Sequence, residues 1–251
     1  MTLDLHQFGY DQDNYGVLLH ESESGETAMV DAGDAAAARA ALATAGWQLT
    51  QIWITHHHGD HTAGLQDIAA ETGAVIYGPA GVSGVTNTLS GGDSFVFAGR
   101  RVEVLATPGH TLDMLNYHLA SESLAFTGDT LFAMGCGRLF EGDAEMMWES
   151  LTKLMALDDE TIIYCSHEYT AANAAFALSV DPDNQALQRR AEAVAELRAA
   201  GQPTVPTIMA LEKETNPFLR ADDAAIRTVL GMESATDSAV FAEIRRRKDS
   251  F

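Results

Sequence analysis

The feature of this 251-residue sequence that most constrains its fold is a histidine-rich segment between a short apolar run and a helical pattern. Residues 55–61 read THHHGDH, follow the apolar run Ile52–Ile54, and precede a helical pattern that begins near Gly64. A solvated, histidine-rich turn is the blander interpretation. Four histidines directly after a buried strand favour a binding role instead, because buried polar groups without partners are costly.

Side-chain alternation divides this segment into two groups of candidate metal ligands. In an extended chain, residues two apart point the same way, so His56 and His58 converge on one point. Asp60 and His61 lie where the chain turns into the helix, and they face a second point. Imidazole plus carboxylate is a ligand set of zinc and other borderline first-row metals. His57 points away from His56 and His58 by the same alternation, so we expect it to support or pack rather than bind.

Further candidate ligands follow three other apolar strands. His110 lies in a TPGHT turn, Asp129 in a TGDT turn, and His167 directly after the run that ends at Cys165. Each alone is compatible with a capping or turn residue. Polar residues at the ends of several strands meet at one edge of a sheet, where α/β folds place their sites. Taken with the first segment, they are better explained as ligands.

The number of ligands predicts two divalent metal ions. The predicted distribution is His56, His58 and His110 on one ion, Asp60, His61 and His167 on the other, and Asp129 bridging them. Such a pair, about 3.5–4 Å apart, polarises a carbonyl and generates hydroxide near neutral pH, with Asp60 and Asp129 as the catalytic carboxylates. The sequence contains no GxSxG elbow, Walker loop or GxGxxG loop. Zinc is the expected metal, with iron and manganese as alternatives.

Short apolar runs and helical patterns alternate along the first two-thirds of the chain, which predicts a mixed α/β class. The predicted strands are Gly16–Leu19, Thr27–Val30, Gln51–Thr55, Ala74–Tyr77, Ser94–Phe97, Val102–Ala106, Met114–Leu119, Ser123–Phe126 and Thr161–Tyr164. The predicted helices are Ala35–Ala45, Gly64–Thr72, Ala144–Ala156, Asn184–Ala200, Ala221–Leu230 and Ser238–Arg247. After about Tyr169 the composition becomes helical throughout, which predicts a helical appendage.

Composition and charge exclude several classes of partner. The net charge of −21 argues against a nucleic acid or an anionic membrane surface, because phosphate binding needs clustered Lys and Arg. No apolar run approaches the about 18 residues of a membrane-spanning helix, and the start shows no signal-peptide pattern, so we expect a cytoplasmic protein. Cys136 and Cys165 are too few for a disulfide framework and are expected to be reduced packing residues.

These motifs together resemble those of the metallo-β-lactamase superfamily and, over the whole chain, of the glyoxalase II (hydroxyacylglutathione hydrolase) family. The superfamily resemblance rests on the THxHxDH segment and the TPGHT and TGDT turns. The family resemblance adds the segments GCGRLFEG (135–142), SHEYT (166–170), EKETNPFLR (212–220) and RRRKDSF (245–251). Phe140 departs from the pattern, since some family members have a tyrosine there.

The resemblance implies a four-layer αβ/βα sandwich over residues 1–170 and a small helical, glutathione-binding domain over residues 171–251. It implies hydrolysis of S-D-lactoylglutathione to D-lactate and glutathione, the second step of methylglyoxal detoxification. We expect the protein to be a monomer. Arg138, Tyr169, Arg245 and Lys248 are the implied substrate-binding residues. Arg and Lys suit the two carboxylates of glutathione, although a basic helix C-terminus is also common for electrostatic reasons.

Four alternatives remain within reach of the same motifs. A mononuclear-iron sulfur dioxygenase acting on glutathione persulfide shares the fold, but it leaves the second ligand group without a role. A nuclease or phosphodiesterase is disfavoured by the acidic composition. A β-lactamase is normally secreted, whereas the start of this sequence shows no signal-peptide pattern. A diiron electron-transfer protein of this fold carries an added flavin domain, for which the C-terminal helical region is too short.

Overall fold

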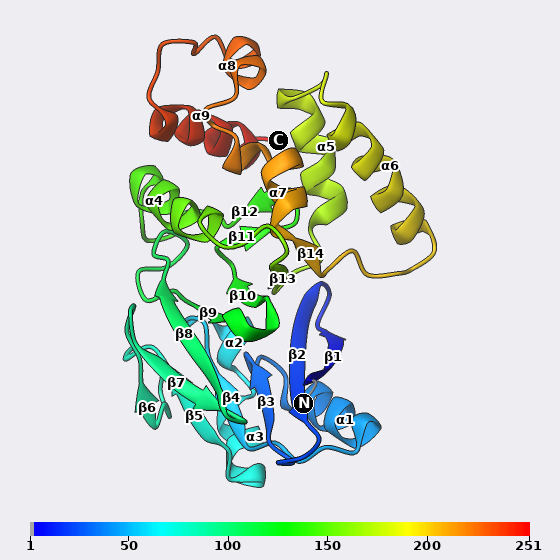
Figure 1. The fold of residues 1–251 in the computed structure, drawn as a ribbon, viewed down its shortest axis with the longest axis vertical. Helices are drawn as coiled ribbons and strands as arrows, with labels where there is room; N and C mark the ends of the chain where they lie inside the picture. Colours follow the sequence, from blue (N-terminus) through cyan, green and yellow to red (C-terminus); the bar gives the residue numbers. More distant parts are fainter. Residues whose placement is uncertain (1–2) are drawn as a thin grey trace. The chain divides into compact units, whose positions relative to one another are not determined.

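The computed structural model describes residues 3–251, which divide into two compact units. The first unit comprises Met1–Ala106 and Asp113–Gly128, and the second comprises Thr107–Leu112 and Asp129–Phe251. Figure 1 labels the elements of both units on the ribbon.

The elements of the first unit are strands, two α-helices on crossovers, one short helix and one 3₁₀ turn. In chain order they are β1 (Leu3–Tyr10), β2 (Asn14–Glu21), β3 (Thr27–Val30), α1 (Ala35–Ala45), β4 (Gln51–Trp53), α2 (Gly59–Thr62), α3 (Leu65–Thr72), β5 (Val75–Gly78), β6 (Asn87–Thr88), β7 (Ser94–Phe97), β8 (Arg100–Ala106), β9 (Leu115–Leu119), η1 (Ala120–Glu122) and β10 (Leu124–Gly128).

The first sheet of this unit has the order β1-β2-β3-β4-β5-β6. Its first pairs are antiparallel, and β3, β4, β5 and β6 are parallel neighbours, which requires the crossovers through α1 and α3. Helix α1 is an alanine-rich run between an Asp34 cap, which accepts from Ala36 and Ala37 N–H, and Gly46 at φ 74°. The small side chains of α1 pack against the sheet in one buried cluster with Met29, Ile52 and Ile68.

The second sheet contributes β7, β8, β9 and β10 to this unit as successive antiparallel neighbours. Trp53 of β4 is fully buried between the two sheets. Its ring contacts Phe95, Phe97, Tyr117 and Phe126 of the second sheet, at centroid distances of 5.3–6.1 Å. This unit therefore has three layers: the helices, the first sheet and the second sheet. Strand β4 runs through the core, and the residues after its C-terminal end leave it.

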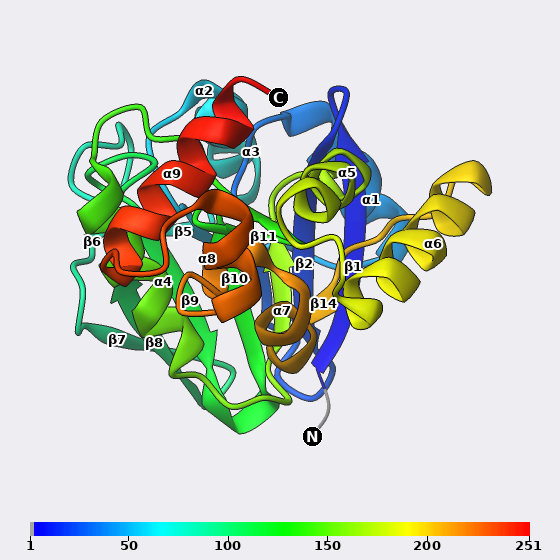
Figure 2. The ribbon, with the colours of Figure 1, turned by 90° about the horizontal axis from the view of Figure 1, so that it is seen from above.

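The second unit contains the remaining strands and mainly helices. Its elements are β11 (Leu131–Phe132), β12 (Gly135–Cys136), α4 (Ala144–Met155), β13 (Ile162–Cys165), α5 (Thr170–Val180), α6 (Gln185–Ala199), β14 (Thr207–Ile208), α7 (Met209–Thr215), η2 (Pro217–Leu219), α8 (Ala224–Leu230) and α9 (Asp237–Asp249). Strands β11 and β12 form a hairpin, and β13 pairs with β14 antiparallel. Figure 2 shows α5 beside α6, and their shared apolar cluster includes Ala177, Leu187 and Val194.

A buried polar network joins the C-terminal helices to the β11–β12 hairpin within this unit. Glu212 of α7 is fully buried, forms an ion pair with Arg190 of α6, and accepts the Met134 N–H at 2.9 Å. Asn216 donates to the carbonyl oxygens of Phe132 and Gly135 at 3.2 and 3.0 Å. These contacts satisfy backbone groups of Phe132, Met134 and Gly135 in the hairpin.

The structure agrees with most predicted elements and adds several. Every predicted strand has a counterpart, although β1, β6, β11, β12 and β14 were not predicted. Helices α2, α5 and α7 were likewise not predicted, although the helical composition after Tyr169 is confirmed. Among the described residues, strand β1 lies at the edge of its sheet beside β2, and most of its side chains are only partly buried. In residues 3–251, no helix is both long enough and apolar enough to cross a membrane.

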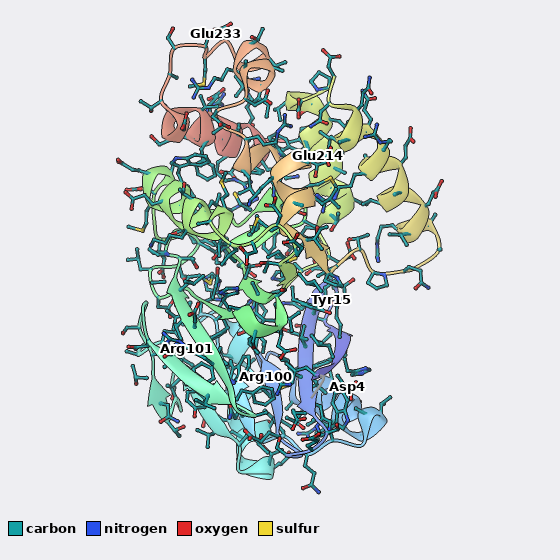
Figure 3. All side chains as sticks on the ribbon, viewed as in Figure 1. Asp4, Tyr15, Arg100, Arg101, Glu214 and Glu233 are labelled. Carbon is teal, nitrogen blue, oxygen red and sulfur yellow. The ribbon has the colours of Figure 1, made fainter. Side chains whose placement is uncertain are left out.

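Acidic side chains account for much of the exposed charge. Asp4, Glu214 and Glu233 are exposed, and Figure 3 labels these three side chains. Arg100 is buried and donates to Glu122 at 2.6 Å, whereas its neighbour Arg101 is exposed. Part of the small positive charge of the chain is thus used internally.

Candidate metal centre

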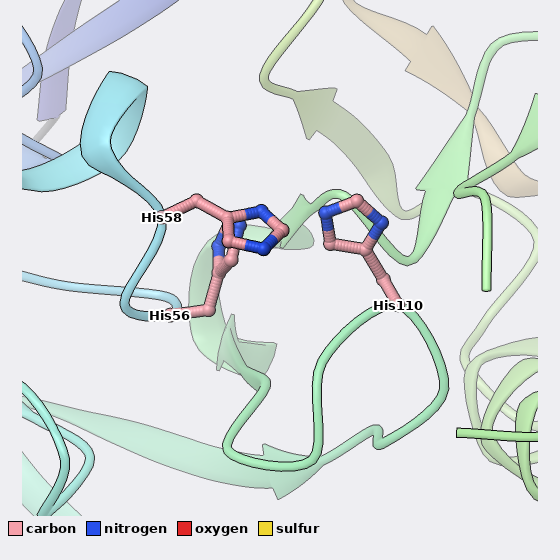
Figure 4. Close-up of side chains that lie close together, drawn as sticks. All are labelled: His56, His58 and His110. Carbon is pink, nitrogen blue, oxygen red and sulfur yellow. The ribbon is translucent and has the colours of Figure 1, made fainter. Parts of the chain in front are cut away.

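Three imidazole rings of the first unit converge just beyond β4. His56 and His61 are fully buried, with ring centroids 4.1 Å apart, and the His58 ring lies 4.7 Å from that of His56. The backbone stays extended past β4 because Ile54 N–H and Thr55 C=O bond to Tyr77 and Leu115, which aims His56 and His58 alike. Figure 4 shows these two rings on their segment, and the His110 ring on its own loop.

Asp31 holds the Nδ1 side of this cluster. The residue follows β3, is 3% exposed, and accepts from Thr55 N–H at 2.8 Å, Thr55 Oγ1 at 2.9 Å and His61 Nδ1 at 2.8 Å. Because the Thr55 hydroxyl donates to Asp31, its oxygen accepts from His56 Nδ1 at 3.0 Å. Both rings are thereby fixed in the tautomer whose Nε2 carries the lone pair, as metal-binding histidines require.

The β1–β2 hairpin positions Asp60. Asn14 donates to Asp60 Oδ2 at 3.0 Å, and the Tyr10 hydroxyl donates to the Asp60 carbonyl oxygen at 2.8 Å. The same Oδ2 lies 3.3 Å from His61 Nε2. A β-carbon at Gly33 would come 1.9 Å from the Asp60 carbonyl oxygen, so this close approach requires glycine. Asp60 Oδ2 and His61 Nε2 therefore lie together as candidate metal-ligand atoms, as predicted.

In the second unit, Asp129 lies between two imidazoles. Its Oδ2 is 3.3 Å from His110 Nε2 and 3.4 Å from His167 Nε2, and all three residues are buried. His110 Nδ1 donates to the Arg138 carbonyl oxygen at 2.8 Å, which makes Nε2 the ligand nitrogen of that ring as well. A single carboxylate oxygen shared by two imidazole edges suits a group that bridges two ions.

The seven predicted ligands are thus presented as a group of four in the first unit and a group of three in the second. These clusters of histidine and aspartate have the donor chemistry to bind divalent metal ions. His57 takes no part in either cluster. Its ring is 39% exposed, and its Nδ1 lies 3.0 Å from Asp113 Oδ1, so it pairs at the surface.

Three supporting residues were not predicted from the sequence: Asp31, Tyr10 and Asn14, which contact the candidate ligands His61 and Asp60. Asp31 had a recognisable signal, because it follows a buried strand just as Asp129 does. Tyr10 and Asn14 had none, since they approach Asp60 across 50 and 46 residues of sequence.

Comparison with known proteins identifies the family. The metallo-beta-lactamase superfamily model matches residues 11–167, and the hydroxyacylglutathione hydrolase C-terminus model matches residues 168–251. The hydroxyacylglutathione hydrolase of Rhizobium meliloti (strain 1021) is 54% identical over 254 residues, covering 100% of this chain and 99% of that protein. The chain belongs to the hydroxyacylglutathione hydrolase family. The family resemblance of the sequence is confirmed.

Another relative agrees with this assignment, and two solved structures share the fold. The hydroxyacylglutathione hydrolase of Maricaulis maris (strain MCS10) is 53% identical, covering 98% of each chain. The crystal structure of ETHE1 from Myxococcus xanthus has a TM-score of 0.67 and 25% identity, covering 100% of this chain and 99% of that one. The BLEG-1 B3 metallo-beta-lactamase has a TM-score of 0.66 and 20% identity, covering 86% and 99%. The predicted α/β metallo-β-lactamase fold is confirmed.

The four residues that the sequence resemblance implies for substrate binding differ in their surroundings. Arg138 is 60% exposed, and its Nε lies 3.6 Å from Asp249 Oδ1. Arg245 is buried, donating to the Cys136 carbonyl oxygen and to Asp249, both at 2.9 Å. Tyr169 stacks on the ligand candidate His167 with ring centroids 4.7 Å apart and planes at 2°.

The remaining implied contact, Lys248, is partly buried on α9 and donates to the Ala172 carbonyl oxygen at 2.9 Å. Burial lowers the pKa of its amine, and nearby Arg245 lowers it further. Phe140, for which the sequence resemblance noted a tyrosine in some family members, is exposed and meets the His110 ring edge-on with ring centroids 5.2 Å apart.

The two cysteines are free and buried, which confirms their prediction as reduced packing residues. Burial raises the pKa of the Cys136 thiol to about 11 and that of the Cys165 thiol to about 12. A thiol with so high a pKa is a poor nucleophile at neutral pH. Neither cysteine competes with the histidine and aspartate clusters as a catalytic group.

Proposed function

We propose that this protein hydrolyses S-D-lactoylglutathione to D-lactate and glutathione. The observation that carries the proposal is full-length identity of 51–54% to relatives named hydroxyacylglutathione hydrolase. The histidine and aspartate clusters support the same chemistry, because divalent ions held there would stabilise a transition state that gains negative charge on oxygen.

We further propose that the two ligand groups together bind two metal ions. The distribution of the ligands is the one predicted from the sequence, with Asp129 shared between the two ions. The tautomers fixed by Asp31, Thr55 and the Arg138 carbonyl support this, since each leaves Nε2 as the donor. Two divalent ions held there would polarise the thioester carbonyl and lower the pKa of a water. Zinc is the proposed metal. Iron is the main alternative, and a structural neighbour, TTHA1623, was solved in a di-iron-bound form.

The chain's own residues would orient the reactants. Asp60, held through Asn14 and Tyr10, would accept a hydrogen bond from the attacking water and orient it. Asp129 would contribute its carboxylate to the centre beside the Nε2 atoms of His110 and His167, which lie 3.3 and 3.4 Å from its Oδ2. A glutathione thiolate leaves readily, so no strong general acid is required. Arg138, Tyr169, Arg245 and Lys248 are the proposed contacts to glutathione, whose carboxylates suit their charge.

We propose a catalytic domain over residues 1–170 and a helical glutathione-binding domain over residues 171–251. We also propose a monomeric, cytoplasmic protein whose substrate is a small molecule, without a nucleic-acid or membrane partner.

Elemental analysis and a thioester assay on one purified sample test the reaction and the centre together. We expect about two metal ions per chain, with loss of thioester absorbance matched by thiol release. Asp129→Asn should lose both metal and activity. The matched control is Asp143→Asn, because Asp143 caps α4 and asparagine caps equally well. One iron per chain, no hydrolysis, and oxygen uptake on glutathione persulfide would instead identify a sulfur dioxygenase.

A further inference from the structure

The Lys248 ammonium group lies against two aromatic rings. Its Nζ is 5.3 Å from the centroid of the Phe176 ring and 5.5 Å from that of the Phe251 ring. The two rings meet edge to face, with centroids 5.5 Å apart and planes at 74°. Both distances lie within the range in which a cation is attracted to a ring face.

Helix α5 supplies both the hydrogen-bond acceptor of this ammonium and one of its two rings. Ala172 and Phe176 lie one turn apart on α5, so the carbonyl oxygen that accepts from Lys248 and the ring beneath it share one face of the helix. Tyr169 precedes the first residue of the same helix. Lys248 is thereby fixed along α5, close in sequence to another proposed substrate contact.

We propose that Phe251, with Phe176, forms an aromatic seat that positions the Lys248 ammonium for the glutathione part of the substrate. A flexible lysine loses side-chain entropy when it binds a carboxylate, and a side chain already held in place loses less. Phe176 is buried and is part of the hydrophobic core. Phe251 is 68% exposed, so its side chain contributes little to the core. Phe251 is thus a positioning residue that acts through Lys248. This inference rests on the proposed thioesterase function.

Kinetics of Phe251 variants test the inference. For Phe251→Ala we expect KM for S-D-lactoylglutathione to rise about two- to fivefold, the equivalent of one exposed cation–π contact, with kcat within about twofold. Phe251→Trp should restore KM, because it keeps an aromatic face. Phe251→Leu keeps apolar bulk only, so it should resemble Phe251→Ala.

A double-mutant comparison separates positioning from general loosening. In a Lys248→Ala background, Phe251→Ala should not raise KM further, because the residue through which it acts is gone. An unchanged KM in Phe251→Ala, or effects that multiply in the double variant, would overturn the proposal.

NMR tests the seat without any assay of activity. The chain has three lysines, Lys153, Lys213 and Lys248, so lysine-selective labelling gives few signals. We expect the Cε–Hε signal of Lys248 to be shifted upfield by the rings and to move back in Phe251→Ala, while the signals of Lys153 and Lys213 stay in place. A Lys248 signal that Phe251→Ala leaves unmoved would rule out the seat. Lack of thioesterase activity in the wild-type protein would overturn the proposed function, and the NMR result would still decide whether the seat exists.

Discussion

Gly137 passes directly over the backbone of Asp129, so closely that a β-carbon on Gly137 would lie 1.9 Å from the Asp129 carbonyl oxygen. The same β-carbon would lie 3.2 Å from the His110 side chain. Two of the three proposed ligands of the second unit therefore depend on the absence of a single side chain.

Gly137→Ala should displace the Asp129 backbone and lose bound metal and activity together. We expect a loss of stability of about 1–3 kcal/mol from overpacking, measured by denaturant unfolding alongside metal content. Gly81→Ala is the matched control, because its nearest neighbour would be Asp113 Oδ2 at an ordinary 3.6 Å. Full metal content in Gly137→Ala would contradict the role of this close contact.

Asp31→Asn should weaken metal binding while the fold survives. Asparagine tolerates the positive φ of 57° at this position, but it lacks the charge that holds His61 Nδ1 and Thr55. We expect metal affinity to fall about 10- to 100-fold, measured by competition with a chelator. Asp34→Asn, three residues later, keeps the cap of α1 and should bind metal as the wild type does. Equal affinities in the two variants would exclude this role for Asp31.

His57→Ala and His58→Ala should differ sharply although the residues are adjacent. His57 makes a surface pair with Asp113, and exposed pairs of this kind contribute about 0–1 kcal/mol. We expect His57→Ala to keep its metal and activity, and His58→Ala to lose about one metal ion per chain. Elemental analysis of both variants decides the matter, and metal loss in His57→Ala would mean that the ligand assignment is wrong.

Cys136 should make the protein less stable at alkaline pH. Its thiol has a pKa of about 11 in the folded state against an ordinary 9.0, mainly because of burial, while nearby Arg245 partly offsets this. Above pH 9 the unfolded chain loses the thiol proton first, so unfolding becomes easier as pH rises from 9 to 11. The full loss is about 3 kcal/mol at most. Unfolding free energies at pH 8 and pH 10.5 should therefore differ less in Cys136→Ala than in the wild type.

The sequence predicted which histidine and aspartate side chains cluster better than it predicted what holds them in place. His56, His58, Asp129 and His167 each follow an apolar run, and strand periodicity with chain turns was enough to group them. The contacts of Asp31 with His61 and of Tyr10 with Asp60 join residues 30 and 50 positions apart, which local patterns do not relate. Strand β1 was not predicted for a different reason. It lies at the edge of its sheet among the described strands, so most of its side chains are only partly buried and show no clear apolar pattern.

The network of Glu212 and Asn216 bears on how this chain can be divided. These two residues lie in the segment matched by the hydroxyacylglutathione hydrolase C-terminus model, yet they bond to the backbone of Phe132, Met134 and Gly135 in the superfamily segment. The point where the two matches meet is therefore not a seam at which the polypeptide can be cut or recombined. A chimera that exchanges C-terminal segments between relatives must preserve both side chains, or it will strip the hairpin beside Asp129 of its hydrogen-bond partners.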